Sequence, residues 1–200
     1  MISIPLIRRE LTSELLGRHI YLFGAGSAPT EILQRLADAG AQEGTVVLSA
    51  TDGTRLGAAA LFRPHLAVGA VPLFAAIATL ALDEALGRGD RHATPLWPDL
   101  VTVDDVIVGR SVAEAATTGQ RACYVILGAE IDVRALEATS RGAGDWNTIV
   151  AAFLNALDKW ATAYAARGPA AVKGAIQFHP RAPERARDKS GGMQCAFAMS

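Results

Sequence analysis

The segment from Val68 to Leu86 limits the fold most strongly, because it is apolar on almost every side. Its charged residues, Asp83 and Glu84, come near its end, and Gly87 follows directly. The segment is long enough for a helix of about five turns, and glycine commonly follows the last helical residue. A helix without a polar face must be covered all round, so we expect it to be buried against a sheet.

The rest of the chain alternates helical and strand-like patterns. Asp52-Gly53 between two apolar runs predicts a tight hairpin turn, and Asp104-Asp105 predicts a second turn. Helices are expected over 29–39, over 145–167 and again from Pro169, and strands over 45–49, 56–62, 94–97, 100–103, 106–108 and 124–133. This order predicts an α+β protein with a mainly antiparallel sheet and helices packed on one face.

The chain has 200 residues, the size of one domain. Beyond Phe178 the composition changes to prolines, glycines and charged residues, including Arg181, Arg185 and Arg187. Such a composition is typical of a segment that forms no core of its own. We therefore expect a single domain over 1–178 and a mobile C-terminal tail over 179–200.

Charge excludes some classes of protein. The chain carries 19 basic and 20 acidic residues, so we do not expect nucleic acid or an anionic membrane to be its main partner. The basic residues are mostly arginine: the three lysines are Lys159, Lys173 and Lys189, and none precedes them. Chemistry that needs a lysine in the body of the domain is therefore excluded.

Cysteine and histidine usage indicates a cytoplasmic protein without a metal site. Cys123 and Cys195 are far apart, with no Cys-x-x-Cys pair. The apolar run 68–82 is shorter than the roughly 20 residues of a membrane span, and the first residues do not form an export signal. The four histidines are scattered without metal-ligand spacing.

Two segments carry the most specific residues. Trp97-Pro98-Asp99 closes one predicted strand, and proline there favours a position at the sheet rim. A strand end with a solvated aspartate is the simpler interpretation of this motif. The strand 127–133 contains Gly128 and two acidic residues, and a glycine inside a strand often marks the close approach of a ligand or another backbone.

These segments resemble the catalytic domain of the biotin/lipoate protein ligase family. That family has a Lys-Trp-Pro-Asn-Asp strand end, a Lys-Leu-Ala-Gly-Ile hairpin and a Gly-Ile-Gly-Ile-Asn strand. The counterparts here lie at 96–100, 106–110 and 127–132, and the resemblance covers about 30–168. It implies the ligase catalytic fold, with biotin, lipoate or ATP as ligands and a biotinyl- or lipoyl-carrier domain as partner.

The cationic groups that such ligases use differ in this chain. The strand lysine corresponds to Leu96, the hairpin lysine to Val106 or Ile107, and the arginine- and glycine-rich loop is reduced to a turn beside Arg55. One lost catalytic donor typically raises a barrier by roughly 3–4 kcal/mol, so we expect adenylation to be lost. A transferase branch of the superfamily uses a cysteine with a lysine, but Cys123 has no such lysine and is expected to be a buried, unreactive thiol.

We therefore expect a divergent ligase-like protein that binds a small acyl or carboxylate ligand without adenylating it. The alternatives are an active ATP-dependent ligase or acyltransferase in which arginines replace the lysines, and a non-catalytic subunit or scaffold that associates with another protein or a second copy. The ligand-binding residues expected at the cleft mouth are Arg55, Trp97, Asp99, Gly109, Arg110, Gly128 and Asp132. Arg110, which follows a hairpin glycine, is the best candidate to bind a carboxylate or phosphate.

Overall fold

The structure is a computed structural model of the whole chain, and its described residues are 2–24, 28–51, 54–89, 91–139 and 144–178. The predicted tail over 179–200 and the Asp52-Gly53 turn lie outside this part.

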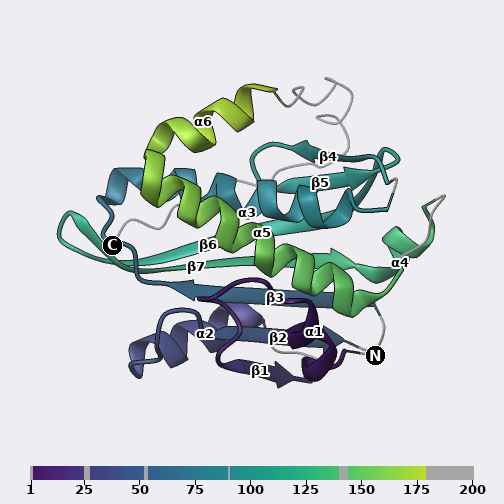
Figure 1. Cartoon of the computed structure of the whole chain (residues 1–200), viewed down its shortest axis with the longest axis horizontal. Coiled ribbons are helices and arrows are strands. Elements are labelled where there is room, and N and C mark those ends of the chain that lie inside the picture. The colour runs from purple at the N-terminus through teal and green to yellow at the C-terminus, as the bar shows by residue number, and fades with distance from the viewer. Residues whose placement is uncertain (1, 25–27, 52–53, 90, 140–143, 179–200) are drawn as a thin grey trace, which may run out of the picture.

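One mixed, mostly antiparallel sheet forms the centre of the molecule (Figure 1). Its strand order is β1-β2-β3-β7-β6-β5-β4, and only the β1–β2 pair is parallel. The strands are β1 (Ile20–Phe23), β2 (Val46–Thr51), β3 (Arg55–Phe62), β4 (Ala93–Leu96), β5 (Leu100–Val103), β6 (Val106–Thr118) and β7 (Arg121–Asp132). The predicted α+β class is confirmed.

Most helices cover one face of this sheet, as predicted. They are α1 (Ile4–Glu10), the 3-10 turn η1 (Val68–Ala70), α3 (Val71–Leu86), α4 (Val133–Glu137), α5 (Trp146–Arg167) and α6 (Pro169–Phe178). The exception is α2 (Pro29–Asp38), whose Leu33 and Ala37 pack on the other face against Val47, Leu61 and Ile126. Within the described residues no other helix contributes to this second cluster, so beyond α2 that face is open there.

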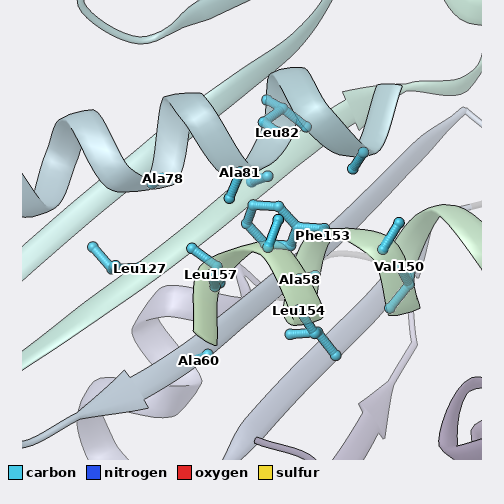
Figure 2. Packing of buried hydrophobic residues seen from close by; sticks show 14 of the residues in the cluster. Ala58, Ala60, Ala78, Ala81, Leu82, Leu127, Val150, Phe153, Leu154 and Leu157 are labelled. Carbon is cyan, nitrogen blue, oxygen red and sulfur yellow. The ribbon is translucent and has the colours of Figure 1, made fainter. Parts of the chain in front are cut away.

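The main core lies where α3 and α5 cross the sheet. Phe153 of α5 points toward Ala81 and Leu82 of α3 (Figure 2), and Leu154 and Leu157 belong to the same buried cluster. The predicted burial of the apolar helix is therefore confirmed. The segment Val68–Leu86 has a mean hydropathy of 1.6, which is apolar enough for a membrane span, but from Phe74 onward most of its side chains are buried in this core.

The strand predictions hold except for the extent of β6. The antiparallel β2–β3 hairpin is confirmed, and Asp104 and Asp105 form the turn between β5 and β6 with positive φ angles of 51° and 64°. Such angles are what a two-residue hairpin turn needs. The strand predicted over 106–108, ending at Gly109-Arg110, in fact continues to Thr118, because β7 pairs with it over that whole length. Strand β1 and the helices α1 and α4 were not predicted, and the strand expected over 124–133 is β7, which runs from Arg121 to Asp132.

Candidate functional site

A cleft lies on the open face of the sheet, where β3 begins, β7 ends and the start of β6 runs along the other side of β7. Its volume is about 270 Å³, near the lower end of small-molecule sites. We call it the arginine cleft; its lining residues are Arg55, Ile107, Val108, Gly109, Arg110, Glu130, Ile131 and Asp132. Four of the seven predicted ligand-binding residues thus line one cleft.

Arg110 and Asp99 form an ion pair at the edge of the cleft. The Arg110 Nε donates to Asp99 Oδ2 at 2.9 Å, and the two side chains are 48% and 33% exposed. A guanidinium has five N–H donors, and only the one on Nε takes part in this bond. The bond to Asp99 therefore orients the Arg110 guanidinium and leaves its terminal nitrogens accessible to an anion.

Buried hydroxyls hold the Trp97-Pro98-Asp99 segment against β6 and α3. Thr79 Oγ1 donates to the Pro98 carbonyl at 2.7 Å and lies 2.7 Å from Ser111 Oγ. The Ser111 amide donates to the Asp99 carbonyl, also at 2.7 Å. Trp97 packs against the main core and is not among the residues lining the cleft, so its role here is to anchor the segment that carries Asp99.

Arg55 and Asp132 face each other across the β3–β7 ladder. Asp132 Oδ1 also accepts a hydrogen bond from the Ala135 amide at 2.9 Å and so caps the N-terminus of α4. Asp132 therefore lines the cleft and also fixes the start of the helix that follows β7.

The two predicted glycines make close approaches to protein atoms. A Cβ on Gly109 would lie 3.0 Å from Leu82 Cδ2 in α3, on the face opposite the arginine cleft. A Cβ on Gly128 would lie 2.9 Å from the Ala58 carbonyl oxygen and 3.3 Å from Thr30 Cγ2 in α2. Gly109 contributes to the lining, whereas Gly128 lies outside it, under the start of α2.

Some lining residues were not predicted. Glu130 faces Arg110 across the β6–β7 ladder, and Ile107 is 52% exposed at the mouth. The sequence signal for Glu130 was available, because strand alternation places it on the same face as Gly128 and Asp132. Ile107 could not be found in this way, because the register shift between β5 and β6 decides where it points.

The prediction that Cys123 is buried was wrong. Cys123 is exposed on β7, and its Sγ lies 3.0 Å from Thr118 Oγ1. The β6–β7 ladder shifts register between Ala116 and Thr117, close to this position, and the strand end beyond it is solvated. Cys123 lies toward the opposite end of β7 from Asp132, so it is remote from the arginine cleft.

The described residues include no group of three or more His, Cys, Asp or Glu side chains that could hold a metal ion. They also place no lysine in the arginine cleft. Lys159 lies on α5, where its Nζ pairs with Glu84 Oε1 at 2.7 Å, and Lys173 lies on α6. The cationic side chains that line the cleft in this part of the chain are therefore Arg55 and Arg110.

Comparison with solved structures shows where this architecture recurs. A biotin protein ligase-like protein of unknown function from Silicibacter sp. TM1040 superposes with a TM-score of 0.67 at 14% identity, over 82% of this chain and 78% of that one. Biotin protein ligase from Aquifex aeolicus in complex with biotin and ATP gives 0.63 at 14% identity, over 80% and 77%.

This chain has the fold of the biotin protein ligases.

The biotin ligase-like fold extends over most of the chain. The Leishmania major biotin protein ligase in complex with biotin covers 89% of this chain and 88% of its own, with a TM-score of 0.53 at 14% identity. No family model and no curated sequence matches the chain. The likeness is thus one of architecture, and the chemistry of the cleft must be argued from its own residues.

Proposed function

We propose that this biotin ligase-like protein binds a small acyl or carboxylate ligand in the arginine cleft and does not adenylate it. The observation that carries the proposal is Arg110, whose Nε binds Asp99 and whose terminal nitrogens are left for a ligand, in a cleft that also contains Arg55, Glu130 and Asp132 and in a part of the chain that has no lysine. The Aquifex aeolicus ligase, which has the same fold, has a solved structure in complex with biotin and ATP. A carboxylate-bearing ligand therefore suits both the fold and the residues present.

Arginine suits binding better than catalysis at this position. A guanidinium can form two parallel hydrogen bonds to one carboxylate. It stays protonated at all ordinary pH values, so it cannot act as a general base or as an acylated nucleophile. Asp99, which fixes Nε, leaves the terminal nitrogens of Arg110 for the ligand.

The positions that resemble the ligase lysines are apolar. Leu96 ends β4 half-buried, and Val106 and Ile107 are 41% and 52% exposed at the start of β6. None of them can offset the charge that develops on a phosphate during adenylation. The cleft volume of about 270 Å³ is also more in keeping with a small acyl ligand than with an acyl-adenylate.

A pyrophosphate-release assay tests the absence of adenylation. The purified protein is incubated with ATP and magnesium, and with biotin, lipoate or octanoate in turn. We expect no release above the ATP-only background. Turnover with any of these acids would instead support the alternative of an active ligase in which arginines replace the lysines.

A binding titration tests the ligand class. We expect octanoate, lipoate or biotin to bind, and Arg110→Gln to weaken that binding about 10- to 100-fold, as the loss of a charged hydrogen bond predicts. Arg121→Gln is the matched control, because Arg121 is exposed at the far end of β7. Equal affinities of the two variants and the unmodified protein would refute the assignment of Arg110.

The remaining features of the proposal concern the whole chain. We propose a single domain over residues 1–178, a cytoplasmic location, and a biotinyl- or lipoyl-carrier domain as the macromolecular partner if the protein delivers its ligand. The scaffold alternative requires a partner that contacts residues 179–200. A change in assembly size when these residues are removed would favour that alternative.

A further inference from the structure

A larger cavity lies on the helix-covered side of the sheet, away from the arginine cleft. Its volume is about 620 Å³, well within the range of small-molecule sites. It lies where α5 ends, α6 begins and α3 starts, at the left of Figure 1, and it is partly open to solvent. Strand β3 begins in the arginine cleft at Arg55 and ends in this cavity at Phe62, so the two sites are about 23 Å apart.

The walls of this cavity are aromatic and aliphatic. Phe62, Leu66 and Phe74 are buried in the core and line the cavity. The rings of Phe74 and Tyr164 meet edge to face, with centroids 5.1 Å apart. Apolar surface of this kind favours the hydrocarbon body of a ligand, and aromatic faces also attract an organic cation.

Two carboxylates line the cavity, together with one histidine, His65. Glu43, which is exposed, and Asp158, which is half-buried on α5, both line it. Glu43 Oε1 accepts a hydrogen bond from the Arg63 amide at 3.0 Å, which fixes this carboxylate at the rim. Among the described residues, no arginine or lysine side chain lines the cavity.

We propose that this cavity binds an organic amine or quaternary ammonium compound with an apolar body. The hydrocarbon part lies against Phe62, Leu66 and Phe74, and the cationic head lies between Glu43 and Asp158. An anionic ligand would be repelled by both carboxylates, and a neutral one would cover them without offsetting the loss of their hydration. The ligand is thus opposite in charge to the one proposed for the arginine cleft.

Calorimetric titration with two ligands of equal chain length, octylamine and octan-1-ol, tests this proposal. We expect octylamine to bind, and Asp158→Asn or Glu43→Gln to weaken it at least about ten-fold. Glu137→Gln is the matched control, because Glu137 is an exposed carboxylate on α4, and it should leave the affinity for octylamine unchanged.

A second variant locates the binding. Ala161→Phe places a ring into the cavity from α5 and should abolish octylamine binding while circular dichroism stays unchanged. Arg110→Gln should leave octylamine binding intact, which separates this proposal from the one for the arginine cleft. The inference is overturned if octylamine does not bind, if its affinity is the same in both acid variants, or if a folded Ala161→Phe protein still binds it. It is also overturned if octan-1-ol binds as tightly as octylamine.

Discussion

The Arg110 side chain binds Asp99 through its Nε and leaves its terminal nitrogens for a ligand. The ion pair with Asp99 is about half exposed, and exposed pairs contribute only about 0–1 kcal/mol to stability. The pair therefore matters more for where the guanidinium points than for the free energy of folding. A flexible side chain that a carboxylate already holds in place loses less conformational entropy when it binds a ligand.

Tyr124 gives the fold a dependence on alkaline pH. Burial, together with the hydrogen bond from its hydroxyl to Asp38 Oδ1 at 2.8 Å, raises the pKa of Tyr124 to about 12 from 10.0. The unfolded chain releases this proton near pH 10 and the folded chain only near pH 12. The stabilisation is therefore fully present below pH 10 and is lost as the pH rises toward 12.

Tyr124→Phe isolates this effect. We expect the variant to be about 1 kcal/mol less stable at pH 8, because a buried hydrogen bond is lost. Urea unfolding at pH 8 to 12 should show the difference between the two proteins shrinking above pH 10. A difference that stays constant over this range would contradict the assigned cause.

Gly128 is required by the packing of α2. A methyl group there would lie 2.9 Å from the Ala58 carbonyl oxygen and 3.2 Å from Ala59 Cβ. We expect Gly128→Ala to lower the free energy of unfolding by about 1–3 kcal/mol, the usual cost of overpacking. The matched control is Gly174→Ala in α6, where no atom lies within 4 Å and alanine should stabilise the helix by about 0.5–1 kcal/mol. Denaturant titrations of both variants check the opposite signs.

Among the elements, α3 connects the core to the candidate site. Thr79 is fully buried on this helix, and its hydroxyl contacts both the Pro98 carbonyl and Ser111. We expect Thr79→Val to lower the free energy of unfolding by about 1–3 kcal/mol, because the buried Ser111 hydroxyl and the Pro98 carbonyl both lose their hydrogen bond to Thr79. The same change should weaken octanoate binding, since Asp99 follows Pro98 directly.

The control for the Thr79→Val prediction is Thr117→Val, at the exposed end of β6. It should change stability by no more than about 0.5 kcal/mol. Thermal unfolding and the octanoate titration measure the two effects separately. If Thr79→Val changes neither quantity, the hydroxyl network does not position the Asp99 segment.

Elements with a strong pattern were predictable from the sequence, and weakly patterned ones were not. Helix α5 shows apolar residues at regular helical spacing, and the sequence between the apolar runs that become β2 and β3 contains Asp-Gly. The second half of β6 alternates small or charged residues such as Ser111 and Glu114, which have little strand preference of their own. Its ladder with β7 is what makes it a strand.

At the scale of the whole molecule, the two proposed sites lie at opposite ends of β3 and on opposite faces of the sheet. The arginine cleft lies on the open face beyond α2, and the larger cavity, whose aromatic walls include Phe62 and Phe74, lies on the helix-covered face. The ligands proposed for the two sites have opposite charges, so we do not expect one compound to compete at both.

The boundary of the folded domain can be tested by truncation. We expect a chain ending at residue 178 to unfold cooperatively with the same midpoint, within a few degrees, and to keep its affinity for octanoate. Scanning calorimetry and gel filtration measure these properties. A truncated chain that loses its fold would refute the single domain proposed over 1–178.

The sequence alone determined the fold class, the buried helix and the segments that meet at the cleft, because each rests on local patterns of apolar, turn-forming and glycine residues. Only the tertiary structure decided on which face of the sheet each candidate site residue lies. Strand register placed Gly109 toward α3, Gly128 beneath α2 and Glu130 opposite Arg110. Register depends on pairing between distant segments, and so does the larger cavity, whose walls come from both halves of the chain.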